Sequence, residues 1–422
     1  MAVLIAAALL VGACGSPVSP NPTGSSTSLP SGQSTSPSDV PSSGPSSNPS
    51  SNPSSNPSSN PTQASSSPSP TAIASCAQRV LTGMSLNQRI GQLFALGLAN
   101  NKLGTAELGA IRSQHVGSVW FTATTSIGAA GILAVTKAVQ AQATTAATAG
   151  VRFYIAANQE GGQIQALRGA GFSTIPSAVV QGTKALATLT ADAKVWGRQL
   201  RAAGVNLDFA PVADVVPPGT DATNQPIGVL DREYGHDPAT AGSHAAAFIR
   251  GMTAAGLATT VKHFPGLGRV KNNTDYLAGV VDKITTANDP YLGSFQAAVN
   301  AGAPFAMVAL ATYTKIDSAH LAAFSPTVIG LLRTKLGFKG VIMSDSLTAA
   351  AVASIPAGQR AIDFLLAGGD LVVARSASAV VAMVAAVQAR AATDSKFKVL
   401  VNRAALLILQ AKQASGLLPP GC

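Results

Sequence analysis

The stretch Thr259-Thr260-Val261-Lys262-His263-Phe264-Pro265-Gly266-Leu267-Gly268 indicates the architecture of the chain. It begins with β-branched strand formers, and the Pro-Gly-x-Gly segment at its end can continue neither a strand nor a helix. A cation and an imidazole, Lys262 and His263, therefore close a predicted strand, and a carboxylate, Asp275, follows thirteen residues after Lys262. Catalytic groups are presented in this way at the C-terminal ends of the strands in α/β barrels.

Apolar, strand-like runs recur along the chain, and each is followed by a stretch compatible with a helix. Alanine-rich segments such as 239–255 and 378–392 are typical of the helices. The eight runs are Leu93–Leu96, Gly117–Phe121, Phe153–Ala156, Val205–Phe209, Thr259–Lys262, Phe305–Ala309, Gly340–Met343 and Asp370–Val373. This alternation is expected of parallel strands with crossover helices, and eight units predict a (β/α)8 barrel of the TIM type. A doubly wound open sheet is the alternative, but the glycine-rich phosphate fingerprint that it would carry after its first strand is absent from the sequence.

Polar side chains and glycines gather directly after the predicted strands. Asn158 to Gly162 follow the third strand, Asp208 and Asp214 lie at and beyond the end of the fourth, and Ser344 to Ser346 follow the seventh. Such residues at one end of the apolar runs indicate a pocket. Asp208 and Asp214 are expected to support the rim of this pocket by pairing with backbone or arginine. Trp120 and Trp196 are expected in the core, and the alternative for one of them is a platform on which a sugar stacks.

The first 75 residues differ in kind from the rest. Residues 1–13 form an apolar run that ends in small residues before Cys14, which is typical of a lipoprotein signal peptide with lipid added to the cysteine. The usual positive charges before the run are missing, so the true start lies upstream or the signal is atypical. Residues 14–75 are rich in Ser and Pro and are expected to form a disordered tether. Residues 76–422 have a globular composition and form the predicted barrel domain.

The charge and the cysteines set further expectations. The formal net charge is +10, and because residues 1–75 carry only Asp39, the globular part carries all of the excess. The Lys and Arg residues are scattered along the sequence, which argues against a nucleic-acid partner and leaves anionic cell-wall polymers or solubility as explanations. With Cys14 assigned to lipid, Cys76 and Cys422 flank the barrel domain, and we expect a disulfide between them in an oxidising compartment.

Several motifs of the barrel domain resemble one known family. The motifs are Met84–Phe94, Gln159–Gly162, Asn206–Val215, the Lys262 loop and Gly340–Leu347. In this order they resemble the single-barrel bacterial β-N-acetylglucosaminidases of glycoside hydrolase family 3, here in a lipoprotein form, from Met84 to about Ala374. The resemblance implies a carbohydrate substrate, no cofactor and a catalytic pocket at the C-terminal ends of the strands.

Asp345 matches the nucleophile of this family. A carboxylate at the end of a strand can attack the anomeric carbon, form a covalent glycosyl intermediate and retain the configuration of the sugar. The alternative is that Asp345 only caps a helix from Ser346 to Ala353.

The acid/base residue is harder to assign than the nucleophile. The family has a His thirteen residues after the loop lysine, and an Asp two residues before this His assists it. This chain has Asp275 and Asn273 at those positions. Three interpretations stay open. Asp275 is the general acid and base with Asn273 as an orienting group, the protein is a glycan-binding relative with impaired catalysis, or another carboxylate such as Asp282 serves as the acid/base. A carboxylate at position 275 would repel phosphate, so water is the expected acceptor.

Substrate contacts carry over in part. Lys262, His263 and Arg232 match sugar-binding residues of the family, and Asn158 stands in place of an Asp but can still hydrogen-bond a hydroxyl. Gln163 and Ala166 replace basic residues, and the register argues against Arg168 as a substitute, so the precise sugar stays open.

These residues together predict an envelope-anchored, retaining exo-β-N-acetylhexosaminidase that removes terminal N-acetylglucosamine from peptidoglycan fragments. A catalytically weak glycan-binding lipoprotein is the alternative. We expect a monomer attached to the membrane through its lipid. No group of Cys, His or carboxylate residues has metal-ligand spacing in the sequence, so no metal is expected.

Overall fold

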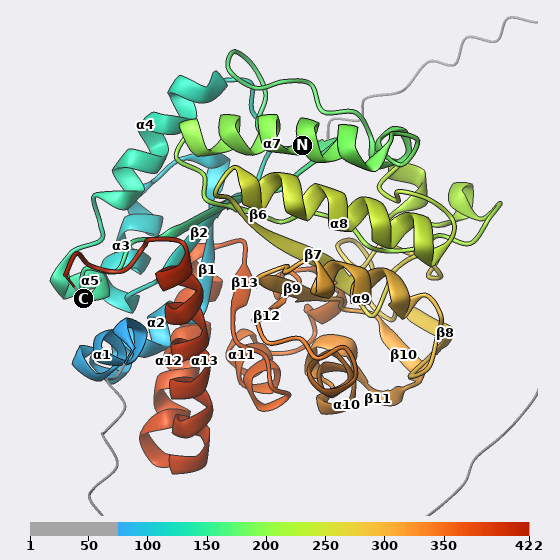
Figure 1. Ribbon diagram of the computed structural model, residues 1–422. Coiled ribbons are helices and arrows are strands. Elements are labelled where there is room, and N and C mark those ends of the chain that lie inside the picture. Colours follow the sequence, from blue (N-terminus) through green and yellow to red (C-terminus); the bar gives the residue numbers. More distant parts are fainter. Residues whose placement is uncertain (1–74, 422) are drawn as a thin grey trace, which may run out of the picture. The chain divides into compact units, whose positions relative to one another are not determined.

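The computed structural model describes residues 75–421, and eight parallel strands form the centre of this region (Figure 1). They are β1 (Phe94–Leu98), β2 (Ser118–Phe121), β3 (Tyr154–Ala157), β6 (Leu207–Asp208), β7 (Ala258–Phe264), β9 (Phe305–Val308), β12 (Val341–Ser344) and β13 (Val372–Ala374). Neighbours follow the order β12-β9-β7-β6-β3-β2-β1-β13, and a parallel bridge between Met343 and Leu371 brings the two outer strands together. The predicted (β/α)8 barrel is therefore confirmed, with each of the eight runs contributing one strand.

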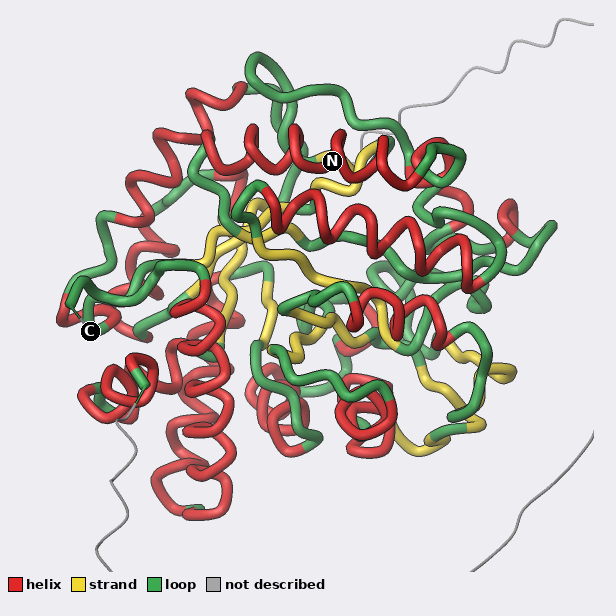
Figure 2. The backbone as a smooth tube through the Cα atoms, viewed as in Figure 1, coloured by secondary structure: helices red, strands yellow, loops and turns green. Residues whose placement is uncertain are grey.

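Helices surround the strands (Figure 2). They are α1 (Cys76–Gly83), α2 (Leu86–Gln92), α3 (Thr105–Gln114), α4 (Gly128–Gln140), α5 (Thr145–Thr148), α6 (Ala178–Gln181), α7 (Leu186–Ala202), α8 (Pro238–Ala254), α9 (Leu292–Asn300), α10 (Pro326–Gly330), α11 (Ala357–Leu366), α12 (Ala377–Thr393) and α13 (Ser395–Ala414). Short 3₁₀ or π turns are η1 (Ala99–Asn101), η2 (Asp221–Thr223), η3 (Gly228–Leu230), η4 (Ala322–Phe324), η5 (Leu331–Lys335) and η6 (Ala350–Val352). The two alanine-rich segments predicted as helices correspond to α8 and α12.

Local sequence explains where α8 begins and how it packs. The side chain of Asp237 accepts hydrogen bonds from the first free backbone N–H groups, and Pro238 occupies the first turn, where a missing N–H costs nothing. Gly251 faces α7 so closely that an added Cβ would lie 2.4 Å from the carbonyl oxygen of Thr190. Small residues thus let α7 and α8 approach each other over the outside of the barrel.

Two small sheets extend the loops after the barrel strands. A hairpin of β4 (Gln159–Gly161) and β5 (Ile164–Gln165) follows β3, and β10 (Thr312–Lys315) pairs with both β8 (Val281–Thr286) and β11 (Asp317–Leu321). The sequence did not predict these strands. They widen the rim of the barrel at the end where the strands terminate.

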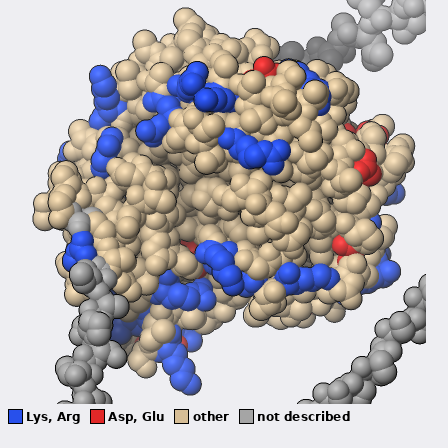
Figure 3. Space-filling view, viewed as in Figure 1, with Lys and Arg blue, Asp and Glu red and all other residues tan. Residues whose placement is uncertain are grey.

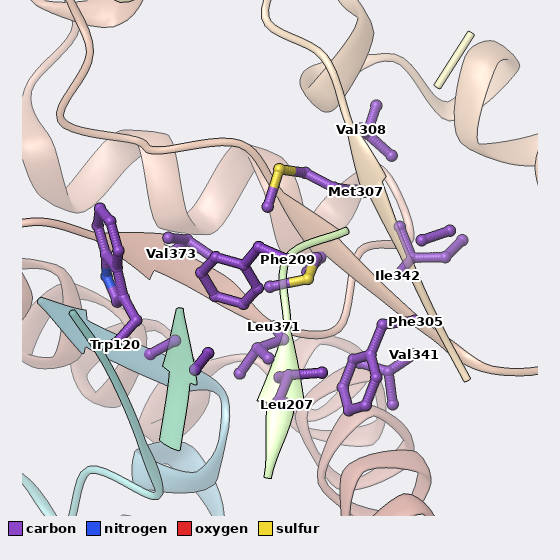
Figure 4. Close-up of a cluster of buried hydrophobic side chains, with 14 of the residues drawn as sticks. Trp120, Leu207, Phe209, Phe305, Met307, Val308, Val341, Ile342, Leu371 and Val373 are labelled. Atoms are coloured by element: carbon purple, nitrogen blue, oxygen red, sulfur yellow. The ribbon is translucent and has the colours of Figure 1, made fainter. Parts of the chain in front are cut away.

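The core fills the inside of the barrel with apolar side chains (Figure 4). Leu207, Phe305, Val341 and Leu371 are at most 1 % exposed. Trp120, at 5 % exposed, also belongs to this cluster but contributes to the cavity described below. The other tryptophan is buried between helices, with its ring 6.3 Å from that of Phe248, as expected for a core residue.

The surface and the terminal segments bear on the remaining expectations. Lys and Arg side chains lie scattered over the visible face, with few acidic residues among them (Figure 3). None of the helices within residues 75–421 is both long and apolar enough to cross a bilayer. The predicted signal peptide, Cys14, the tether up to residue 74 and Cys422 lie outside the described residues.

Candidate active site

One cavity of about 190 Å³ at the C-terminal ends of the strands brings the predicted site residues together. Its lining includes all seven residues to which the sequence gave a catalytic, orienting or sugar-binding role: Asn158, Arg232, Lys262, His263, Asn273, Asp275 and Asp345. Apolar side chains such as Trp120, Phe209 and Met307 complete the lining. Residues more than 180 positions apart in the sequence therefore share one polar cavity with an apolar floor.

Asp345 lies immediately after β12. Its backbone N–H donates to the carbonyl oxygen of Val308 at the end of β9 (2.9 Å), and its Oδ1 accepts from the N–H of Ser346 (2.7 Å). The segment from Ser346 to α11 is described throughout and contains only turns and the short η6. The alternative in which Asp345 caps a helix from Ser346 to Ala353 is therefore wrong, since that helix does not form.

Asp275 lies in a turn that is attached to the Asp345 segment. Its backbone N–H donates to Oδ1 of Asn273 (2.9 Å), so Asn273 orients the main chain of the turn. The carbonyl oxygens of Thr274 and Asp275 accept from the N–H groups of Ala351 (3.0 Å) and Ala350 (3.2 Å) in η6. These two backbone hydrogen bonds join the loop of one carboxylate to the loop of the other.

The surroundings of Asp275 favour its protonated form. Burial within the cavity and the negative charge of Asp345 raise the pKa of the Asp275 carboxyl. Basic side chains of the cavity, including Arg232 and Arg375, oppose this rise without cancelling it. A carboxyl group with a raised pKa next to a second carboxylate is the arrangement that a general acid requires.

A buried ion cluster holds the sugar-binding candidates in place. The guanidinium of Arg232 donates from Nε and Nη2 to the two oxygens of Glu160 (2.7 and 2.8 Å), and Nζ of Lys262 lies 2.5 Å from Oε1 of Glu160. Lys262 also donates to Oδ1 of Asn158 (2.7 Å). Burial alone would raise the pKa of Glu160, but the charges and hydrogen bonds of Arg232 and Lys262 outweigh it and lower the pKa to about 2.

Asp214 fixes the orientation of His263. Its carboxylate accepts from Nδ1 of His263 (2.7 Å) and from the backbone N–H groups of His263 (3.2 Å) and Leu267 (2.7 Å). With Nδ1 engaged, Nε2 of the ring is the atom on the cavity side, 3.5 Å from Nη2 of Arg232. Asp214 thus supports the rim, in agreement with the sequence interpretation.

Asp208 plays a similar supporting part below the cavity. It is fully buried and its Oδ1 accepts from the backbone N–H of Gln159 (3.0 Å) at the start of the β4–β5 hairpin. Burial raises its pKa to about 7, although the hydrogen bond and Lys262 act in the opposite direction. Asp208 does not line the cavity, so it supports the rim and does not contact a substrate.

Three residues that were discussed for the site on the basis of the sequence lie outside the cavity. Asp282 is buried in β8, where its carboxylate accepts from the N–H groups of Ile284 and Thr285 and from the Thr285 hydroxyl. The guanidinium of Arg168 donates to the carbonyl oxygens of Gln165 and Gly162. Gln163 lines a neighbouring depression of the surface. None of the three lines the cavity, which argues against Asp282 as the acid/base.

The sequence interpretation missed two charged residues of the site. Glu160 was noted only as part of a motif, although a carboxylate directly after a barrel strand was itself a signal. Arg375 lines the cavity directly after β13 and donates from Nη1 to the carbonyl oxygen of Thr122 (3.0 Å). Its position after the eighth strand could have identified it by the same rule that identified Asp345.

A separate group of ligand-type side chains lies outside this cavity. Asp221, Glu233 and His236 each offer one ligand atom, and these atoms lie within 4.8 Å of one another. The expectation of no metal was based on spacing in the sequence, and it overlooked this group because its members are brought together by an irregular loop.

Comparisons with known proteins agree with the barrel fold. Residues 85–407 match the family described as the glycosyl hydrolase family 3 N terminal domain. The solved structure of a β-N-acetylhexosaminidase from Beutenbergia cavernae is similar, with 46 % identity, a TM-score of 0.76 and coverage of 78 % of this chain and 99 % of that chain.

Curated relatives carry the same kind of name. A β-hexosaminidase of Stenotrophomonas maltophilia is 35 % identical over 272 residues, which cover 60 % of this chain and 76 % of that protein. A β-hexosaminidase of Vibrio cholerae is 35 % identical over 246 residues, which cover 57 % and 69 %. The match to the family extends over the whole barrel, and the chain belongs to glycoside hydrolase family 3.

Proposed function

We propose that this glycoside hydrolase is a retaining exo-β-N-acetylhexosaminidase that releases terminal N-acetylglucosamine. The observation that carries the proposal is the cavity in which two carboxylates, Asp345 and Asp275, face a set of sugar-binding candidates. The names of the similar proteins from Beutenbergia, Stenotrophomonas and Vibrio support the same sugar class. The cavity of about 190 Å³ lies below the roughly 300–1,000 Å³ of pockets for drug-sized ligands, which fits one terminal sugar unit.

In the first step, the carboxylate of Asp345 attacks the anomeric carbon while the bond from this carbon to the glycosidic oxygen breaks. Asp275 gives its proton to the departing oxygen, which leaves as an alcohol. Asp275 is then a carboxylate and the sugar is an ester of Asp345. Water gives a proton to Asp275 and attacks the anomeric carbon, and the ester bond breaks to restore both carboxyl groups.

The cluster around Glu160 supplies the binding part of this mechanism. Lys262 and Arg232 are locked by Glu160, and His263 is locked by Asp214, so their donors meet the sugar hydroxyls without loss of side-chain freedom on binding. The negative charge of Asp275 in the second step disfavours phosphate as the attacking group, so water is the acceptor in this proposal.

Kinetics of two variants with chromogenic N-acetylglucosaminides test the assignment. Asp345→Ala should abolish turnover of every substrate, because no covalent intermediate can form. Asp275→Ala should lose about 10²–10⁴-fold in kcat/KM with a poor leaving group and far less with an activated phenol, which needs no proton. Asp363→Asn, an acid of α11 outside the cavity, serves as the control.

Azide gives a second and independent readout for Asp275. Azide attacks without a general base, so it should restore turnover of Asp275→Ala and give the β-glycosyl azide with retained configuration. Equal losses with good and poor leaving groups would remove Asp275 from the acid/base role. Sugar binding without turnover by the wild type would instead favour the glycan-binding alternative.

We also propose that the enzyme acts on peptidoglycan fragments as a monomer attached to the membrane by lipid on Cys14. The apolar segment before Cys14 and the Ser/Pro-rich segment after it support an anchor with a tether. Mass spectrometry should find a lipid on Cys14, and Cys14→Ser should release the protein from membranes. Release of N-acetylglucosamine from purified muropeptides tests the substrate, and light scattering tests the monomer.

The proposed disulfide between Cys76 and Cys422 is supported by the packing of α1. The N–H of Ala77 donates to the side chain of Gln413 in α13 (2.9 Å), and Ala77 belongs to a small apolar cluster with Leu409 and Leu418. The start of the barrel domain thus packs against its C-terminal segment. Peptide mapping without reduction should recover the two cysteines in one linked pair.

A further inference from the structure

The loop between β6 and α8 holds a group of side chains that the proposed glycosidase mechanism does not use. Asp221 begins η2, and Glu233 and His236 lie in the segment that leads to α8. Their ligand atoms lie within 4.8 Å of one another, which groups them as candidate ligands of a single ion. None of the three lines the catalytic cavity.

Two oxygens of this group have no hydrogen-bond partner among the described residues. Glu233 is 1 % exposed, and its buried Oε2 lacks a partner. Oδ1 of Asp221 is also buried and without a hydrogen bond, and it points into the same group. Two carboxylates side by side with unsatisfied oxygens are costly unless a cation or a shared proton lies between them.

His236 adds a nitrogen ligand and leaves a path for entry. Its Nδ1 lies 3.5 Å from Oδ1 of Asp221 and 3.2 Å from the carbonyl oxygen of Val216. The side chains of His236 and Asp221 are 43 % and 38 % exposed, so an ion can reach the buried Glu233 from solvent. Two carboxylates and one imidazole, with a fourth position open to water, form a donor set that suits zinc.

We propose that Asp221, Glu233 and His236 bind one divalent cation of the zinc type. The cation joins η2 to the segment before α8 and so closes the loop upon itself. Arg232, which directly precedes Glu233, lines the catalytic cavity and holds Glu160. A cation on Glu233 therefore acts as a positioning device for Arg232, and its effect on the reaction passes through sugar binding.

Equilibrium dialysis of the full chain measures this site without any substrate, so its outcome is separate from that of the glycosidase assays. Protein freed of metal by a chelator is dialysed against Zn²⁺, and bound zinc is quantified by mass spectrometry. The wild type should bind one equivalent more than Glu233→Gln and His236→Ala, which should each lose more than about tenfold in affinity. Zn²⁺ should also raise the Tm of the wild type and leave the Tm of both variants unchanged.

His320→Ala is the matched control, since His320 is an exposed histidine paired with Asp317 away from the group. It should bind zinc as the wild type does. Because Glu233 is buried and His236 is half exposed, loss of zinc in both variants excludes simple damage to the core. Equal binding by the wild type and both variants would mean adventitious zinc only, and no binding by the wild type would mean a shared proton. Preference for Ca²⁺ or Mg²⁺ over Zn²⁺ in the same dialysis would overturn the assigned class of cation.

Discussion

Replacement of Glu160 by Gln tests whether the buried ion cluster stabilises the site. Glu160 is 5 % exposed and receives two hydrogen bonds from Arg232 and one contact from Lys262. Its pKa falls from an ordinary 4.5 to about 2 in the folded protein, which corresponds to about 3 kcal/mol of stability at neutral pH. Removal of one partner from a buried ion pair generally destabilises a protein by about 3–5 kcal/mol, which agrees with the value obtained from the pKa shift.

The pH dependence of this loss has a defined sign. The folded-state pKa of Glu160 is depressed, so its stabilisation is complete above about pH 4.5 and disappears as the pH falls toward 2. The difference between wild type and Glu160→Gln should therefore be constant from pH 7 to 5 and should begin to shrink near pH 4.

Urea unfolding measured at pH 7, 5 and 4 provides the assay. Asp192→Asn is the control, because Asp192 forms an ion pair of 2.6 Å with Lys184 in which both side chains are about one third exposed. This exposed pair should contribute less than about 1 kcal/mol. A loss below 1 kcal/mol for Glu160→Gln, or a loss that does not depend on pH, would refute the reasoning. At pH 7 the variant should also raise KM, since Arg232 and Lys262 lose the group that positions them.

Three further outcomes are expected. Burial lowers the pKa of Lys412 to about 7, so between about pH 7 and 10.5 the unfolded chain binds more protons than the folded one. The free energy of unfolding should therefore rise across this range by up to about 1.4 kcal/mol per pH unit. Urea titrations of Lys412→Met at several pH values should lack that slope. An added Cβ at Gly268 would lie 1.9 Å from a backbone carbonyl oxygen, so Gly268→Ala should lose about 1–3 kcal/mol in thermal unfolding, whereas Gly330→Ala, which meets nothing within 4 Å in α10, should not destabilise. Arg375 lowers the pKa of Asp275, so Arg375→Ala should move the alkaline limb of the kcat/KM profile to higher pH, and an unmoved limb would contradict this.

The barrel could be predicted because its strands are buried on both faces. Such strands appear as continuous apolar runs, and the run Gly340–Met343 corresponds closely to β12. The run Val205–Phe209 gave a strand of only two residues, since the side chain of Asn206 replaces part of the backbone pairing. Its Oδ1 accepts from the N–H of Ile155 (2.7 Å) and its Nδ2 donates to the carbonyl oxygen of Phe153 (3.0 Å).

The strands that were missed are short or half exposed. β8 alternates exposed and buried residues irregularly, and β5 has only two residues, so neither carries a period that a sequence reveals. Their existence depends on pairing between segments that the barrel brings together.

The residues of the site also fall into those that the sequence could predict and those that it could not. The ends of buried strands can be located from sequence, and Lys262, His263 and Asp345 line the cavity for that reason. Arg232 and Asp275 lie farther along the loops, and only their match to family motifs predicted them. The approach of Asp221 to Glu233 depends on the path of a loop without regular structure, and no periodicity encodes that path. Asn273 was expected to orient Asp275, and its side chain does so by accepting a hydrogen bond from the backbone N–H of Asp275, a partner that the geometry of the turn selects.

The proximity of Asp275 to Asp345 explains how one carboxyl group can serve both halves of a retaining reaction. Before attack, burial and the charge of Asp345 both raise the pKa of Asp275, which favours the protonated form that the leaving group needs. When Asp345 forms its ester with the sugar, its negative charge is consumed, while the basic side chains that lower the pKa of Asp275 remain in place. Asp275 then becomes a carboxylate that can accept a proton from water. A histidine at this position would pass from +1 to 0 when it gives up its proton, whereas Asp275 passes from 0 to −1. The change of residue therefore makes each state one charge unit more negative, while the same proton is given and taken back in the cycle.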